Sequence, residues 1–400
     1  MNILVVCGWM FPDADGGSFR AVYEIAKSLS AEGHHVTVLT QQVDKQTPLL
    51  ETFEGLQVLR YPVSQRHSLG FFLSTFFNVI RQVRYIYKNT KVDAVSAHHV
   101  VASFGFCVAN RLFGRKPFIY HCYMTKFEEF EDKEMHQKGS KRTFRIRFFS
   151  WILRKMESFV LTQANQIIVL SDYVRKLIEK FYPVVSLKIE KISPGVDGKR
   201  YFYQEKTIAK KELKIEGVNS LFLTVRRLEP RMGIENLMQT VALLKEKGFK
   251  GKFIFIGKGS LYDSLNHLKK TLQIQDEVEL TGWVPDEKVI QYYQAADLFI
   301  LPTRALEGFG LVLLESLACG TPVMATPVGA IPEVLAEMNL PFLFQDESPQ
   351  AMAEGLEKWM KEVRPRLPDP LKIRAEVLKK YSWPAHVSRL SAILSRITKK

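Results

Sequence analysis

The chain has 400 residues and a formal net charge of +14, with 46% hydrophobic and 24% charged residues. This length exceeds one ordinary hydrophobic core and predicts two domains, and the composition is that of a soluble globular protein rather than a disordered or fibrous one. No apolar run approaches the ~18 residues that a membrane-spanning helix needs, so an ordinary helical membrane protein is excluded.

Strand-like and helical patterns alternate from the first residue of the chain. The first residues are apolar without a basic flank or a small-residue cleavage site, so they predict a strand rather than a signal peptide. The alternation predicts a parallel sheet with helices on both faces. Strands are expected at Ile3–Cys7, Val36–Thr40, Ala94–Ala97, Phe118–His121 and Gln166–Leu170, and helices at Phe19–Glu32, Phe72–Tyr87, Val101–Leu112 and Tyr173–Phe181.

A turn-rich segment, Ser193–Gly198, predicts a linker, after which the alternation starts again. We therefore predict an N-terminal domain over 1–197, a C-terminal domain over 198–378, and a final segment over 379–400 whose helix crosses back onto the first domain. Ligands of doubly wound sheets bind outside the carboxyl ends of the strands, so the site is expected in the cleft between the domains. The second set of strands is expected at Leu221–Val225, Lys252–Ile256, Val278–Thr281, Asp297–Leu301 and Pro322–Ala325, and the helices at Ile234–Lys247, Leu261–Leu272, Leu311–Ala318 and Ala385–Ile397.

In the first domain, a glycine pair and a histidine are the candidate site residues. Gly16 and Gly17 follow the first strand and open a helix, where glycines let the backbone approach a diphosphate, although a plain tight turn explains them nearly as well. His121 closes a predicted strand and has a better claim to the cleft than His98 or His99. A strand-end histidine is, however, more often a structural group.

Cysteines and acidic residues give no sign of a metal site. The four cysteines lie in apolar contexts without metal-type spacing, which predicts buried free thiols in a reducing cytosol. Asp13 and Asp15 form an Asp-x-Asp pair, but two acids without further oxygen ligands are a poor metal site. We predict no metal.

A basic segment, Lys138–Lys155, contains seven Lys and Arg residues and no acid. Phe144, Phe148, Trp151 and Ile152 recur in it at helical spacing, so it could lie on an anionic bilayer or bind an anionic polymer. The alternative is an ordinary helix with its aromatic face in the core and its arginines solvated. The aromatic stretch Leu69–Phe77 is more often core, although it could join such a surface.

In the second domain, glycine turns and arginines follow successive strands. Arg226, Arg227 and Arg231 lie between a strand and a helix, where guanidinium groups suit a diphosphate, although surface salt bridges would also explain them. Gly257, at the end of the next strand, suits a flat base, and the backbone of Gly282–Pro285 could bond to that base. Both segments could equally be loops.

Two carboxylates, Glu307 and Glu315, bracket the start of an otherwise apolar helix. An unpaired buried carboxylate is costly, so Glu315 must meet a donor such as a sugar or ribose hydroxyl. Glu307 precedes Gly308-Phe309-Gly310, where backbone N–H groups and the helix dipole make an anion site. The alternative is that Glu307 caps the helix and Glu315 pairs with a structural arginine.

Together these segments resemble the retaining glycosyltransferases of family 4, which have the GT-B fold of two Rossmann-like domains. The resemblance covers nearly the whole chain and is most specific from Thr281 to Val334. It implies a retaining, metal-independent transfer from a nucleotide-diphospho-sugar to a hydroxyl acceptor. The donor base is open, and we favour UDP over GDP or ADP. No cofactor beyond that donor is implied.

The resemblance also implies residue roles. Glu315 would bind the ribose and Glu307 the donor sugar. The amides of Phe309, Gly310 and Leu311 would bind the distal phosphate, and His121 would lie near the transferred sugar. Further donor contacts are assigned to Gly16, Gly17, Arg227, Arg231, Gly257 and Val284. One departure is Met232, where the family usually has lysine, and Arg231 is expected to supply that charge.

Two other functions remain open. A nucleotide-sugar 2-epimerase shares the architecture but would need no acceptor, and a basic nucleic-acid-binding protein would fit the charge. The Glu307/Glu315 pattern argues against both. We expect an envelope lipid or lipid-linked glycan as acceptor, a cytoplasmic location that extends to the inner membrane face through 138–155, and no nucleic-acid partner.

Overall fold

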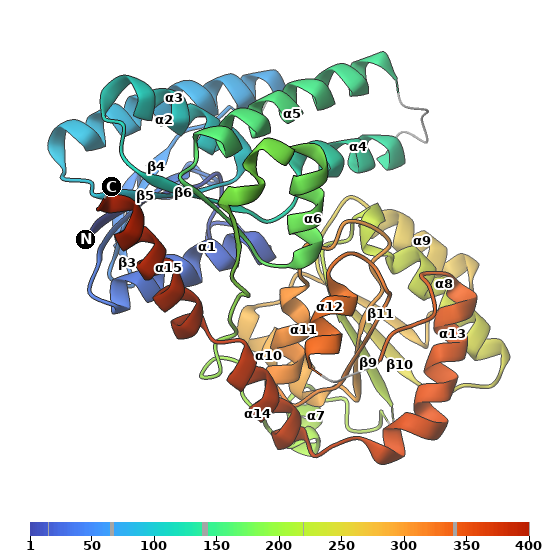
Figure 1. Cartoon of the computed structure of the whole chain (residues 1–400). Coiled ribbons are helices and arrows are strands. Elements are labelled where there is room, and N and C mark those ends of the chain that lie inside the picture. The colour runs from blue at the N-terminus through green and yellow to red at the C-terminus, as the bar shows by residue number, and fades with distance from the viewer. Residues whose placement is uncertain (15, 65–67, 138–142, 219, 339–341, 400) are drawn as a thin grey trace. The chain divides into compact units, whose positions relative to one another are not determined.

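Runs of Val, Ile, Leu and Phe form the buried strands of two separate sheets in the computed structural model of the protein (Figure 1). The structure describes residues 1–399 except 15, 65–67, 138–142, 219 and 339–341. The chain divides into two compact units. The first comprises Met1–Glu131, Lys141–Pro194 and Trp383–Lys400, and the second comprises Asp132–Ser140 and Gly195–Ser382.

The sheet of the first unit has the order β3-β4-β2-β1-β5-β6-β7-β8. All neighbouring strands are parallel except β3 and β4, which form an antiparallel hairpin at one edge. The predicted parallel sheet is therefore present, with an antiparallel hairpin at one edge that was not predicted. The strands are β1 (Asn2–Val6), β2 (His35–Gln41), β3 (Leu50–Phe53), β4 (Leu56–Tyr61), β5 (Ala94–His98), β6 (Phe118–Cys122), β7 (Gln166–Val169) and β8 (Ile189–Lys191).

Helices cover both faces of this sheet (Figure 1). On one face lie α2 (Ser68–Asn89), α3 (Val100–Phe113) and α5 (Phe144–Gln163), and on the other lie α1 (Gly17–Ala31) and α15 (Trp383–Thr398). The last helix is fastened to the end of α1 through Ser391, whose hydroxyl donates to Glu32 and contacts His34 Nε2 at 3.2 Å. The remaining elements are α4 (Lys126–Gln137), α6 (Asp172–Phe181) and the 3-10 turn Pro183–Lys188.

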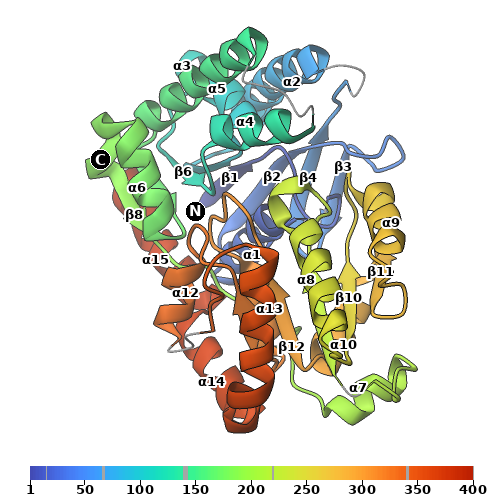
Figure 2. The ribbon, with the colours of Figure 1, turned by 90° about the vertical axis from the view of Figure 1, so that its right-hand side faces the viewer.

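The second unit holds a fully parallel sheet of order β11-β10-β9-β12-β13. Figure 2 shows α8 and α13 side by side along this unit, where Asn236 Nδ2 donates to the Glu347 carbonyl at 2.8 Å. The strands are β9 (Leu221–Val225), β10 (Lys252–Ile256), β11 (Val278–Gly282), β12 (Leu298–Leu301) and β13 (Val323–Ala325). The helices are α7 (Lys206–Glu212), α8 (Ile234–Glu246), α9 (Tyr262–Thr271), α10 (Asp286–Ala295), α11 (Leu311–Ala318), α12 (Ile331–Glu337), α13 (Pro349–Lys358) and α14 (Pro370–Lys380).

Each unit has its own apolar core. Val, Ile and Phe side chains from the first sheet pack with α2, α3 and α6, and a separate cluster joins β9, β10 and β12 to α8 and α13. The four cysteines are buried and free, as predicted. Within the described residues, no helix combines the length and apolar character that crossing a bilayer requires.

Candidate active site

Four loops meet at the carboxyl ends of the strands in the second unit. They follow β9, β10, β11 and β12, and backbone hydrogen bonds tie them to one another. Arg226 N donates to the Ile256 carbonyl at 2.9 Å, and Gly257 N donates to the Gly282 carbonyl at 2.8 Å. The loops after β9 and β12 approach so closely that a Cβ added to Gly233 would lie 1.7 Å from the Pro302 carbonyl oxygen. Most of the sequence-predicted site residues lie on these loops.

Glu307 is held by an arginine from another loop. Its Oε2 accepts from Arg226 Nη2 at 2.7 Å and from Thr303 Oγ1 at 3.2 Å, and Arg226 Nη1 also donates to Thr303. The two charged side chains are only 7% and 14% exposed. Burial alone would raise the pKa of Glu307, but Arg226, Arg231 and Thr303 together hold that pKa below its ordinary value. Glu307 is therefore a carboxylate at neutral pH.

Arg231 fastens the loop that carries Glu307. Its Nη1 donates to the Leu306 carbonyl at 2.6 Å, while its own carbonyl accepts from Arg304 N at 2.9 Å and Ala305 N at 3.3 Å. Leu306 adopts a left-handed backbone with φ of 57°, a conformation that the surrounding hydrogen bonds must stabilise. These contacts set the position of Glu307 before any ligand binds.

The helix after Glu307 begins at a glycine. Gly310 is the N-cap of α11 with φ of 86° and, as a glycine, has no side chain to cap the helix. The Glu307 carboxylate is paired with Arg226. The leading amides of Phe309, Gly310 and Leu311 belong to this helix start, where partial positive charge favours an anion.

Glu315 lies in the second turn of α11 and is half-buried. The hydroxyl of Tyr293 donates to its Oε2 at 2.9 Å. Burial, followed by the Glu315 charge, raises the pKa of Tyr293 well above its ordinary range, so this phenol remains a donor. Sequence reasoning missed Tyr293, because α10 was not predicted.

Met232 points away from the site. Its side chain is 4% exposed and belongs to the apolar core of the second unit. The residue that replaces the family's lysine therefore packs inside the protein rather than facing a ligand.

The other predicted donor contacts of the second unit lie on the same loops. Arg227 is exposed directly after Arg226, and Val284 is half-buried before α10. A Cβ on Gly257 would lie 1.8 Å from the Arg226 carbonyl oxygen, so only glycine allows these two loops to approach.

The predicted residues of the first unit lie on β6 and at the start of α1. Gly16 is the N-cap of α1 and Gly17 its first residue. His121 is buried in β6, and its ring stacks on that of His98 with centroids 4.2 Å apart. Ser96 Oγ lies 3.1 Å from His121 Nε2, whereas His121 Nδ1 is buried without a partner in the described part of the chain. Burial lowers the pKa of His121 well below its ordinary value, so the ring is neutral.

Acidic residues do not gather into a metal-type cluster in the described ranges, where no group of three or more His, Cys, Asp and Glu is placed to hold an ion. Asp13 instead forms a two-point ion pair with buried Arg60, at 2.5 Å and 3.0 Å. Asp15 lies outside the described residues.

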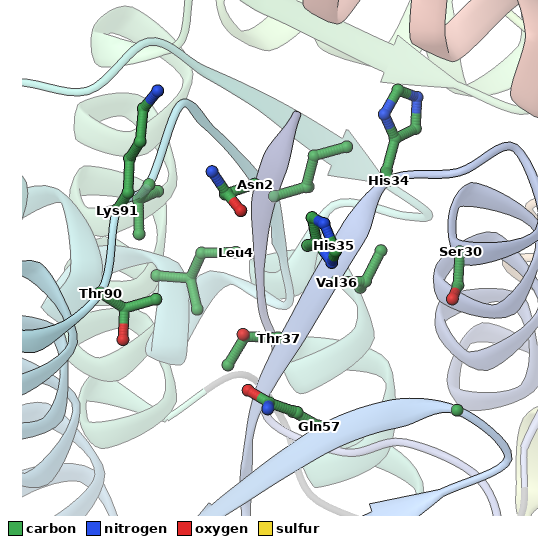
Figure 3. A pocket seen from close by; sticks show the side chains of 13 residues that line it. Asn2, Leu4, Ser30, His34, His35, Val36, Thr37, Gln57, Thr90 and Lys91 are labelled. Atoms are coloured by element: carbon green, nitrogen blue, oxygen red, sulfur yellow. The ribbon is translucent and has the colours of Figure 1, made fainter.

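A cavity of about 310 Å³ lies elsewhere in the first unit (Figure 3). Its lining includes Asn2 and His35, which begin β1 and β2, so it opens at the amino ends of these strands. None of the predicted site residues lines it.

Three aromatic residues in the first half of α5 do not enter the core. Phe144 is 85% exposed and Trp151 56% exposed, and Phe148 is exposed between them. The interpretation that these three side chains pack in the core is therefore wrong. It is also wrong for three exposed side chains of α2, namely Leu69, Leu73 and Phe77. Residues 138–142 of the basic segment lie outside the described residues.

Solved structures with the same architecture define the fold class. Sucrose-phosphate synthase from Thermosynechococcus elongatus matches with a TM-score of 0.83 at 19% identity, covering 99% of this chain and 98% of that one. Anabaena HepE in complex with UDP and glucose matches with a TM-score of 0.77 at 18% identity, covering 99% and 100%. The protein thus has the GT-B fold of glycosyltransferases.

Sequence comparisons then identify the family. The profile described as Glycosyltransferase Family 4 matches residues 15–200, and that described as Glycosyl transferases group 1 matches residues 205–375. An uncharacterised glycosyltransferase of Methanocaldococcus jannaschii is 23% identical over 96% of this chain and 95% of its own. One subunit of human phosphatidylinositol N-acetylglucosaminyltransferase is 25% identical over 99% of this chain and 76% of its own. The chain belongs to the family 4 glycosyltransferases.

Proposed function

We propose that the protein is a retaining glycosyltransferase that transfers a sugar from a nucleotide-diphospho-sugar, preferably a UDP-sugar, to a hydroxyl of an envelope lipid or lipid-linked glycan. The observation that carries this proposal is the ionised Glu307, held by Arg226 shortly before the glycine N-cap of α11. A carboxylate that accepts sugar hydroxyls there adjoins amides that attract a phosphate. The UDP and glucose bound by Anabaena HepE support the choice of donor.

Within this proposal, the donor lies along the four loops of the second unit. Glu315 binds the ribose, Glu307 the sugar, and the amides of Phe309, Gly310 and Leu311 the distal phosphate. Arg227 and Arg231 bind the diphosphate, and Gly257 and Val284 contact the base. In the first unit, Gly16 and Gly17 approach the diphosphate, and His121 bonds the transferred sugar through its unpaired Nδ1.

The chemistry follows from the charges. When the sugar–phosphate bond breaks, positive charge develops on the sugar and negative charge on the departing diphosphate. Fixed cations and helix amides favour that state over the bound substrate, and removing one such donor costs about 3–4 kcal/mol in other enzymes. The acceptor attacks from the face that the nucleotide leaves, and a phosphate oxygen takes its proton. No metal is needed for these steps.

A lipid acceptor is supported by α5 and by a relative. Phe144, Phe148 and Trp151 are exposed on a helix that also carries exposed Arg145 and Arg147, a combination that suits an anionic bilayer surface. The human relative, phosphatidylinositol N-acetylglucosaminyltransferase, is named for a lipid acceptor. We accordingly place this enzyme in the cytoplasm, peripheral on the inner membrane face.

Thermal unfolding with UDP, GDP and ADP in turn tests the donor site. A nucleotide at ~100 times its dissociation constant should stabilise the protein by roughly 2.7 kcal/mol. Glu315→Ala and Arg227→Ala should abolish the shift, while Arg366→Ala, at an exposed position without a predicted role, should leave it unchanged. Absence of a shift with every nucleotide would contradict the proposal.

Incubation with UDP-sugars separates the alternative functions. Release of free or epimerised sugar without any gain from lipid acceptors would favour a 2-epimerase. A salt-sensitive affinity for polynucleotides without a response to nucleotides would favour a nucleic-acid-binding protein.

A further inference from the structure

Arg304 has one edge of its guanidinium group buried and unpaired. Its Nε and Nη2 are both shielded from solvent, and neither has a hydrogen-bond partner among the described residues. These neighbouring nitrogens form a planar edge that suits two oxygens of one phosphate or carboxylate. Because desolvated charged donors are costly when unpaired, this edge is suited to an anionic partner.

The backbone places Arg304 within the donor-site loops. It lies three residues before Glu307, and its N–H donates to the Arg231 carbonyl at 2.9 Å. The following peptide makes a second bond to the same carbonyl, and Arg231 Nη1 bonds the Leu306 carbonyl. The backbone of Arg304 is therefore fixed beside that of Arg231, on the loop that carries Glu307.

The loops after β9 and β12 carry a net positive charge, which favours an anion. Glu307 is already engaged by Arg226, so these two charges offset each other. Arg227, Arg231 and Arg304 add three positive charges, and Glu229 adds one negative charge. Position 232 adds none because Met232 lies in the core. These loops thus carry more positive than negative charge.

We propose that Arg304 is an anion-binding residue that takes two oxygens of a phosphate group through Nε and Nη2. Under the proposed function, on which this choice of source rests, the phosphate belongs to the donor diphosphate, and Arg304 replaces the cation that position 232 lacks. A phosphate on the acceptor offers the same chemistry and is the other possible source.

Calorimetric titration of the full chain with UDP, uridine and inorganic phosphate tests the assignment. Arg304→Gln should weaken UDP binding at least tenfold and abolish phosphate binding, with uridine affinity unchanged because it has no phosphate. Arg304→Lys keeps the charge but loses the planar edge, so it should fall between the two. Arg366→Gln removes one exposed positive charge of the same unit and should match the wild type.

Each result decides one point. Wild-type affinities for both UDP and phosphate in folded Arg304→Gln would overturn the proposal, and Arg304→Lys answers the same question if the glutamine variant does not fold. If Arg304→Gln loses phosphate binding but binds UDP as wild type does, Arg304 binds an anion, and that anion is a phosphate on the acceptor. If the wild type binds no UDP, the proposed function fails, and phosphate binding by the wild type and Arg304→Gln still tests the anion edge.

Discussion

At the residue scale, the ion pair between Arg226 and Glu307 makes a strong prediction about stability. Arg226→Met leaves a buried carboxylate without its main partner, which should destabilise the protein by about 3–5 kcal/mol. Adding Glu307→Gln to this variant removes the unpaired charge and should recover most of the loss. Urea unfolding at pH 7 measures both variants. Equal stability of Arg226→Met and wild type would show that the pair contributes nothing.

The same pair predicts a pH dependence. The pKa of Glu307 is lower in the folded protein than in the unfolded chain, so its stabilising contribution is complete above the unfolded value and is lost as pH falls through the folded value. Arg226→Met should raise the folded pKa towards or above the unfolded value, so that acidification should destabilise this variant less than wild type or even stabilise it. Unfolding measured from pH 7 to pH 3 tests this, with Glu307→Gln as the variant that lacks the titration. Identical pH profiles for Arg226→Met and wild type would refute it.

Residue types and spacing were enough to select Glu307, Glu315 and Arg231 as site candidates. They were not enough to select Arg226 as the partner of Glu307, because the two lie 81 residues apart and the packing of their loops decides the pairing. Arg304 was missed for the same reason, since nothing in the sequence tells a buried guanidinium edge from a solvated one. The inward direction of Met232 was likewise set by the core.

At the scale of elements, the close approach of the loops after β9 and β12 depends on Gly233. Alanine there must adopt φ of 75° and would place Cβ against the Pro302 carbonyl, so we expect a loss of more than about 2 kcal/mol. Gly248→Ala is a matched control, because Gly248 has the same φ of 75° but open space around it. It should cost only about 1 kcal/mol. Equal losses in the two variants would show that the loop contact is unimportant.

The exposed face of α5 predicts binding to anionic vesicles. Arg145→Glu with Arg147→Glu reverses two charges, each worth about 1 kcal/mol near such a surface, so flotation should fall at least tenfold. Phe144→Ser with Trp151→Ser should also weaken binding, whereas Phe202→Ser changes an exposed aromatic residue outside this face and should not. Unchanged flotation of both double variants would exclude this surface as a membrane contact.

Strands and apolar helices were the elements that sequence patterns predicted well. Leu221–Val225, Lys252–Ile256 and Leu311–Ala318 were confirmed residue for residue, because their apolar runs end at turn residues. The β3–β4 hairpin and the polar helices α4, α7, α10, α13 and α14 were missed. These elements are only partly buried or are buried on one side, so their sequences show no clear apolar periodicity. Tertiary packing determines their conformation instead.

At the scale of the whole molecule, the restart of the strand–helix alternation after residue 198 predicted a second parallel sheet, which the structure confirms. The edge of the first sheet could not be predicted in the same way. An antiparallel hairpin needs only a short turn, and Glu54-Gly55 gave a weaker signal than the long crossovers around it.

The division into two units predicts that damage to one core leaves binding by the other intact. Leu390 is fully buried on α15, which belongs to the first unit although it ends the chain. Leu390→Ala should therefore destabilise the first unit by about 2–5 kcal/mol, whereas Ser388→Ala, exposed on the same helix, should have little effect. Hydrogen exchange of β1 and β5 measures the first effect, and UDP titration reports on the loops of the second unit.

Faster exchange in the first sheet with unchanged UDP affinity would mean that the second unit holds the nucleotide by itself. The fully parallel sheet and its four loops would then be sufficient to form the nucleotide site. Loss of UDP affinity in step with the faster exchange would contradict this. It would mean either that the two cores open as a single cooperative unit or that the contacts proposed for Gly16 and Gly17 contribute to UDP binding.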